Sequence, residues 1–182
     1  MNNANEQFHA PESYINCRTL IIGEVNSGKT SLTQTIMQSL IQAGHGREIL
    51  LLDLAPIATQ GIGGKMRPRS KEILRLTAII RPPRLTGNDA HHIQQLADQN
   101  ARAIEPLIDR ACASQRDILI VNDASLYLQA GAFARFQSLV DAFATAVINA
   151  YYGKSFKPAP FTDTERQNVK RLIEICDRTI AL

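Results

Sequence analysis

Long apolar runs and a hydrophobic leader are both missing from this chain of 182 residues. No apolar stretch approaches the roughly 20 residues that a membrane-spanning helix needs. The first twelve residues, Met1 to Glu12, are polar and do not resemble a secretory signal peptide. The sequence therefore predicts a protein that stays in the cytoplasm and does not insert into a membrane.

Cysteine is scarce, and its spacing is typical of neither disulfide frameworks nor zinc sites. Cys17, Cys112 and Cys176 are odd in number, far apart and in no Cys-x-x-Cys pair. They are predicted to be reduced cysteines of the core. His91 and His92 occupy adjacent positions of a predicted helix and diverge by about 100°, which argues against a joint metal site. Internal repeats and low-complexity segments are missing too.

What is present is enough apolar residue for one core. The hydrophobic content is 45%, and a chain of this length forms one domain. Apolar runs predict buried strands, which are listed here: 19–22, 49–53, 76–80, 117–123, 146–149 and 179–182. Residues 1–15 are expected to form a flexible arm, and residues 16–182 a single domain.

Between these runs the apolar residues recur with helical spacing. One helix is expected from Thr30 to Gly44, and a long one from Asp89, kinked or restarted at Pro106. Two more are expected around Phe133–Phe143 and after Thr162, where Thr162 and Glu165 have capping-box spacing. Strands separated by helices predict a three-layer α/β/α sandwich with a mostly parallel sheet.

The most specific motif is Gly23-Glu24-Val25-Asn26-Ser27-Gly28-Lys29-Thr30, here named the glycine loop, which matches Gly-x-x-x-x-Gly-Lys-[Ser/Thr] between a strand and a helix. Backbone N–H groups of such a loop, with the positive end of the helix, hold phosphate oxygens. Lys29 can reach the β and γ phosphates, and the Thr30 hydroxyl can bind Mg²⁺. Residues 23–31, Ser31 included, are predicted to bind a nucleoside triphosphate.

By these residues the chain resembles the P-loop NTPase superfamily, with its Walker A motif at Gly23 to Thr30. The resemblance implies the P-loop NTPase fold, Mg²⁺ as cofactor, and phosphate contacts from Gly28, Lys29 and Thr30. It also implies an acidic residue at the end of another strand. Asp53 and Asp123 both follow apolar strands, and both are predicted as catalytic or metal-binding residues.

A second feature is a cationic segment from Lys65 to Arg84 with a net charge of +6, which leaves −3 for the rest of the chain. It follows the glycine-rich stretch Gln60–Lys65, so it is either a mobile loop at the phosphates or a solvated surface. Lys65, Arg81 and Arg84 are the predicted phosphate or substrate contacts. Nucleic acid is a weaker alternative, because the segment has no aromatic residue on which bases could stack.

Two functions remain open at this stage. The first is a Mg-ATP-dependent NTPase in which residues 55–71 sense the γ-phosphate and reshape a surface for a protein partner. The second is a small P-loop kinase that phosphorylates a hydroxyl of a metabolite or polynucleotide. Residues 149–152, Asn-Ala-Tyr-Tyr, do not match the Asn-Lys-x-Asp motif of guanine-specific members, so ATP is favoured and GTP stays open. The oligomeric state cannot be read from the sequence.

Overall fold

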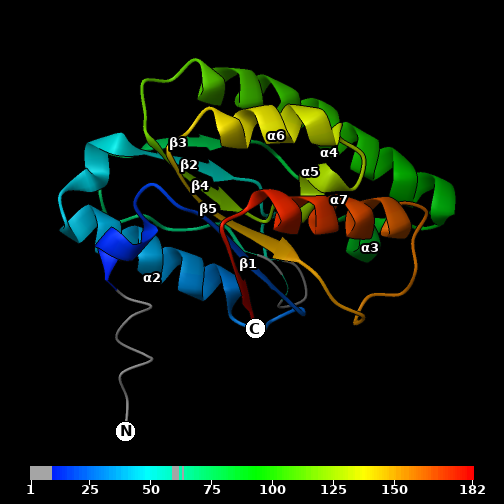
Figure 1. Ribbon diagram of the computed structural model, residues 1–182. Coiled ribbons are helices and arrows are strands. Elements are labelled where there is room, and N and C mark those ends of the chain that lie inside the picture. Colours follow the sequence, from blue (N-terminus) through cyan, green and yellow to red (C-terminus); the bar gives the residue numbers. More distant parts are fainter. Residues whose placement is uncertain (1–9, 59–61, 63) are drawn as a thin grey trace, which may run out of the picture.

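A computed structural model describes residues 10–58, 62 and 64–182 (Figure 1). The strands are β1 (Arg18–Gly23), β2 (Ile49–Asp53), β3 (Leu74–Thr77), β4 (Ile118–Asn122), β5 (Thr145–Tyr151) and β6 (Arg178–Ala181). The helices are η1 (Pro11–Tyr14), α2 (Lys29–Gln42), η2 (His45–Glu48), α3 (Pro83–Thr86), α4 (Ala90–Cys112), α5 (Ser125–Leu128), α6 (Phe133–Asp141) and α7 (Thr162–Ile175).

The strands form one six-stranded sheet in the order β3-β2-β4-β5-β1-β6, and every pair of neighbours is parallel. All carboxyl ends therefore lie at one edge. Helix α2 lies on one face of the sheet and α4, α6 and α7 lie on the other, as Figure 1 shows. The predicted three-layer α/β/α arrangement and the parallel sheet are confirmed.

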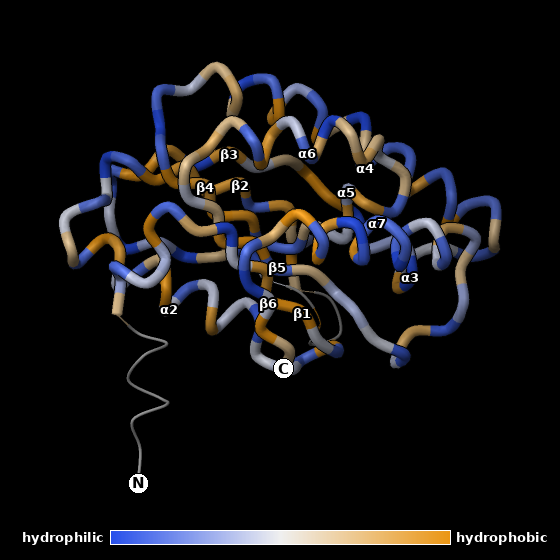
Figure 2. Tube along the Cα trace, viewed as in Figure 1, coloured by the Kyte–Doolittle hydropathy of each residue, from blue (hydrophilic) through white to orange (hydrophobic). Residues whose placement is uncertain are grey.

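Each face of the sheet has its own core, because side chains alternate along a strand. Leu20, Leu50 and Leu52 point into the larger cluster beneath α4–α7. Ile21 and Leu51 point into the smaller cluster with Ile36 and Leu40 of α2, on the other face. Figure 2 shows the strands as the most hydrophobic part of the tube. Burial on both faces explains why the strands are continuous apolar runs rather than alternating ones.

The third strand lies earlier than the sequence predicts. It spans Leu74–Thr77 rather than residues 76–80, and the Ile79 side chain is 91% exposed. The reason is that β2 is the neighbour of β3 in the sheet and ends at Asp53, opposite Thr77. Among the described residues, those after Thr77 have no neighbouring residue of β2 with which to pair.

Two predicted helix signals also turn out differently. Helix α4 begins after its N-cap Asp89, as expected, but is continuous through Pro106, so no second helix begins there. Its buried face continues past the proline with Leu107 and Ile108, and this packing maintains the helix. The capping box of α7 does not form, because Glu165 is buried and bonded to Arg84 instead.

The amino-terminal arm is shorter than predicted within the described residues; residues 1–9 lie outside them. Residues Pro11–Tyr14 form the 3₁₀ helix η1, and the Tyr14 side chain is completely buried, with the guanidinium of Arg178 over its ring at 4.9 Å. The three cysteines are free, as predicted, but none is fully buried, and Cys112 is exposed. No described helix is long and apolar enough to span a membrane.

Removing the Tyr14 ring should destabilise the domain although the residue lies in the predicted arm. Truncation of a fully buried aromatic side chain leaves a cavity and costs about 3–5 kcal/mol. Tyr14→Ala is expected to lower the free energy of unfolding by that amount in urea titrations. Ile79→Ala, at an exposed position, is the control and should leave it within about 0.5 kcal/mol. Equal stabilities of the two variants would contradict the anchoring role of Tyr14.

Candidate functional site

The glycine loop crosses the carboxyl edge of the sheet between β1 and α2. Gly28 has a φ of 94° and Asn26 a φ of 59°, so both are left-handed, a conformation that Gly and Asn tolerate best. At Gly23 a Cβ atom would lie 2.5 Å from the Leu182 carbonyl oxygen and 2.7 Å from Ser27 Oγ. The N-cap of α2 is Gly28, and no side chain caps this helix end, which is the geometry that binds anions.

The loop faces a cavity of about 400 Å³. The cavity is lined by Val25, Asn26, Ser27, Gly28, Lys29, Thr30, Ser31, Pro56, Ile62, Pro82, Pro83, Arg84, Leu85, Asp123, Ser125, Leu126, Gln129, Asn149, Tyr151, Phe156 and Glu165. Most predicted loop residues are in this lining. Gly23 and Glu24 are not.

Lys29 and Thr30 begin α2 and border the cavity. The Lys29 ammonium donates to the Glu24 carbonyl oxygen and, at 3.5 Å, to Ser27 Oγ. Burial lowers the pKa of Lys29, while Asp123 and Glu24 act in the opposite direction. The Thr30 hydroxyl donates to Asn122 Oδ1 at 3.3 Å. At the N-terminal end of α2, Lys29 is thus bonded to the loop backbone, whereas Thr30 has only a long bond to Asn122.

Glu24 has a different environment from the rest of the loop. Its carboxylate accepts hydrogen bonds from the Lys154 N–H at 2.6 Å and from the Ser155 N–H and hydroxyl at 3.2 and 2.6 Å. These bonds lower the pKa of Glu24, the Ser155 hydroxyl having the largest effect. Gly153 packs so closely that an added Cβ would collide with the carboxylate. Glu24 therefore fastens the loop after β5 to the glycine loop.

Asp123 follows β4 and lies in the lining of the cavity. Its backbone is left-handed, with φ of 62°, and its N–H donates to Asn149 Oδ1 at 2.9 Å. Burial, followed by the nearby Glu165 carboxylate, raises its pKa from 3.8 to about 6, and Lys29 opposes the shift. A carboxyl group with such a pKa can exchange protons near neutral pH.

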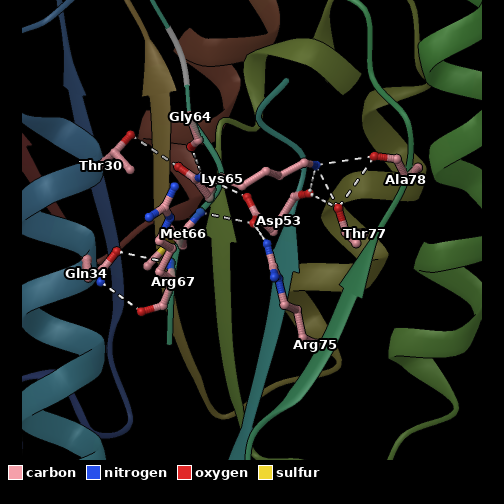
Figure 3. A network of polar contacts seen from close by, with 11 residues as sticks. Thr30, Gln34, Asp53, Gly64, Lys65, Met66, Arg67, Arg75, Thr77 and Ala78 are labelled. Carbon is pink, nitrogen blue, oxygen red and sulfur yellow. Dashed lines mark hydrogen bonds and ion pairs between the residues drawn. The ribbon is translucent and has the colours of Figure 1, made fainter. Parts of the chain in front are cut away.

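Asp53 does not border the cavity; it is completely buried within a polar network (Figure 3). Its Oδ2 accepts from the Arg75 guanidinium at 2.5 Å and from the Met66 N–H at 3.1 Å, and its Oδ1 accepts from Asn122 Nδ2 at 2.8 Å. These bonds occupy both oxygens. The structure thus brings Asp123, but not Asp53, to the surface of the cavity.

Asn122 connects the two acidic positions, and the sequence reasoning missed it. Its Oδ1 accepts from Thr30 and from Asn149 Nδ2, and its Nδ2 donates to Asp53 and to the Gly64 carbonyl oxygen at 3.1 Å. Asn149 also donates to Thr33 Oγ1 at 2.9 Å. The signal was available, because Asn122 and Asn149 are polar residues at or near the carboxyl ends of apolar strands. In the sequence Asn122 stands directly before Asp123, where the P-loop pattern prefers an apolar side chain, so it is taken as an interruption and not as a site residue.

The cationic segment is dispersed rather than gathered at the cavity. Lys65 Nζ donates to the Asp53 carbonyl oxygen at 2.8 Å, to Thr77 Oγ1 at 2.7 Å and to the Ala78 carbonyl oxygen at 3.3 Å (Figure 3). Burial lowers its pKa. Neither Lys65 nor Arg81 is in the lining, and Arg81 is exposed. Gln60, Gly61 and Gly63 of the glycine-rich stretch lie outside the described residues.

Arg84 is the one predicted contact of this segment that borders the described cavity. Its guanidinium pairs with both oxygens of Glu165, at 3.0 and 2.6 Å, and lies 4.6 Å from the centre of the Phe161 ring. The aromatic rings of Tyr151 and Phe156, also in the lining, meet edge to face at 5.1 Å. From the sequence, Tyr151 follows a strand and fits either a base or substrate pocket or an exposed turn; the structure places it in the lining, whereas no sequence signal singled out Phe156.

Comparison with known proteins adds no family to this geometry. No family model matches the chain, and a search of curated proteins finds no match. Nor do the described residues contain a group of three or more His, Cys, Asp or Glu side chains that could hold a metal ion by themselves.

The raised pKa of Asp123 predicts how stability depends on pH. An unfolded aspartate loses its proton near pH 4, whereas the folded one keeps it to about pH 6. The folded state therefore binds more protons in this window, and stability should fall as pH rises from about 4 to 6. The expected loss is on the order of 2 kcal/mol. Asp123→Asn should lack this part of the pH dependence in urea titrations, and an unchanged profile would contradict the assignment.

Proposed function

We propose that this protein is a P-loop NTPase that binds Mg-ATP at the glycine loop, with GTP as the alternative nucleotide. The observation that carries the proposal is the position of the loop. An uncapped helix end, Lys29 and Thr30 open together into a cavity at the carboxyl edge of a parallel sheet, where nucleotides bind in this class of fold. A cytoplasmic location, where both Mg²⁺ and ATP are available, fits this proposal.

The residues at the cavity fit a magnesium ion that is shared with phosphates. Mg²⁺ prefers oxygen ligands and keeps several waters, so one hydroxyl and one carboxylate suffice beside phosphate oxygens. Thr30 would supply the hydroxyl and Asp123 the carboxylate, since both border the cavity. When bound, the ion neutralises charge that develops on the transferred phosphoryl group. Asp53 is unsuitable for this role because Arg75, Met66 and Asn122 already occupy its oxygens.

Hydrolysis coupled to a loop is the reaction we favour. Thr30 is connected through Asn122 to Asp53, and Asp53 holds the Met66 N–H and Arg75. A ligand that draws the Thr30 hydroxyl away from Asn122 would therefore change the hydrogen bonds that hold Gly64 and Met66. These residues lie at the start of the cationic segment. This chain of hydrogen bonds supports a switch that acts on a protein partner. Asn122 is the residue that connects the glycine loop to the cationic segment.

A kinase is the second candidate, and one observation favours it. Part of the cavity lining is aromatic and lies on elements other than the glycine loop, which would suit a phosphoryl acceptor with a hydroxyl group on a metabolite or polynucleotide. Against it, Arg84 is paired with Glu165 and is therefore not a free cation for the migrating phosphoryl group. Transfer to an added hydroxyl compound would distinguish the kinase from the hydrolase.

Lys29 provides the direct test of nucleotide binding. Lys29→Ala removes the one ammonium at the helix end of the described cavity, and the affinity for Mg-ATP in calorimetry should fall about 100-fold. Lys154→Ala is the matched control, because Lys154 is exposed and only its backbone N–H bonds to Glu24. Tight Mg-ATP binding by the Lys29 variant would refute the proposal.

Substitution of Asp123 should mainly reduce turnover, whereas substitution of Asp53 should mainly reduce stability. Asp123→Asn is expected to reduce phosphate release about 100-fold or more, with less than a tenfold change in Mg-ATP affinity. Asp53→Asn should instead lower the free energy of unfolding by about 2 kcal/mol, because Arg75 and Asn122 lose their charged partner. If Asp53→Asn keeps its stability and loses turnover, Asp53 is the functional acid and our assignment is wrong.

A further inference from the structure

Part of the cavity lining comes from elements other than the glycine loop and differs from it chemically. Five of its lining residues, here named the ring subsite, are Arg84, Gln129, Tyr151, Phe156 and Glu165. They come from α3, from the end of α5, from β5 and the loop after it, and from α7. The proposed function assigns none of them a role in holding phosphate.

The charges in the ring subsite cancel each other. Arg84 and Glu165 form a two-pronged ion pair, and their side chains are only 9% and 5% exposed. Gln129 Nε2 donates to Glu165 Oε1 at 2.8 Å. A phosphate placed here would meet a carboxylate and no free cation, and a cation would meet a guanidinium already committed to Glu165. The subsite is therefore suited to an uncharged group.

Its aromatic side chains favour a flat ligand. Tyr151 and Phe156 lie edge to face, with an interplanar angle of 62°, and both are half-buried, so part of each ring surface stays accessible. The planar Arg84 guanidinium lies over the Phe156 ring at 5.2 Å. Rings and guanidinium planes are the surfaces on which planar heterocycles stack in proteins.

Two buried polar atoms of the subsite lack a partner among the described residues, Arg84 Nε and Gln129 Oε1. The first is a hydrogen-bond donor and the second an acceptor. Buried polar atoms are costly when they are not bonded. A ligand that carries both acceptor and donor groups is the kind that can satisfy such atoms, and nucleobases carry both.

We propose that the ring subsite binds an uncharged planar heterocycle of the nucleobase type, by stacking and by its donor and acceptor groups. The inference rests on the proposed function only in that the same cavity holds the triphosphate. The heterocycle has two sources, the base of the bound nucleotide itself or the base of a separate nucleoside that accepts the phosphoryl group. In both cases the ligand group is an uncharged planar heterocycle.

The test compares three probes by calorimetry and ligand-observed NMR: Mg-ATP, Mg-tripolyphosphate, which has no base, and free adenosine and guanosine, which have no phosphate. Phe156→Ala removes a stacking surface and should weaken binding of the base-containing probe about tenfold, with tripolyphosphate unaffected. Gln129→Met keeps the volume, removes the amide, and should weaken the same probe. Lys157→Ala is the control, because Lys157 is an exposed residue of the same loop and lines neither this cavity nor the smaller neighbouring one that Tyr152 shares with four subsite residues.

Competition distinguishes the two sources. If a nonhydrolysable Mg-ATP analogue displaces the nucleoside, the subsite holds the base of the nucleotide; if both bind together, it holds the acceptor. Either result supports the proposal. Failure of any nucleoside to bind, with ATP no tighter than tripolyphosphate, would overturn it, as would nucleoside binding that neither Phe156→Ala nor Gln129→Met weakens. Nucleoside binding without tripolyphosphate binding would refute the triphosphate site and leave the ring subsite standing.

Discussion

A single buried amide, that of Asn122, joins the parts of this molecule that would otherwise be independent. It stands at the end of a central strand, and its donor and acceptor groups bond to residues from four segments of the chain: Thr30, Asn149, Asp53 and Gly64. In a low-dielectric interior each of these groups must be satisfied, and a partly satisfied network is costly. The positions of these residues at the carboxyl edge of the sheet therefore depend on the whole network and not on any one hydrogen bond.

The sheet topology explains why such a network can exist. Parallel strands bring their carboxyl ends to one edge, and the order β2-β4-β5-β1 places Asp53, Asn122 and Asn149 on consecutive strands next to the glycine loop. The glycine loop and the aromatic wall of the cavity are also tied, since Glu24 binds the segment between Tyr151 and Phe156. The two parts of the cavity lining are thus held together by these hydrogen bonds.

The sequence predicted the fold because its signals are local. Apolar runs such as residues 49–52 mark strands, and the Asp89 cap and Gly44 mark helix ends. It also predicted that the glycine loop and Asp123 lie at the same edge of the sheet, and both contribute to the cavity lining. It could not tell Asp53 from Asp123, because both follow apolar strands, and the difference lies in Arg75 and Met66, which fold back on Asp53 from further along the chain. Arg84 and Glu165 form an ion pair although they are 81 positions apart in the sequence. No local pattern reveals such a pair.

The Glu24 carboxylate and Gly153 are in close contact, although the two residues lie far apart in the sequence. The carboxylate occupies the space where a side chain at position 153 would begin, so a larger residue there would push the Glu24 carboxylate aside. Conversely, loss of the carboxylate would leave the N–H groups of Lys154 and Ser155 without their acceptor. A substitution at position 24 or at position 153 would therefore loosen the link between the glycine loop and the loop after β5.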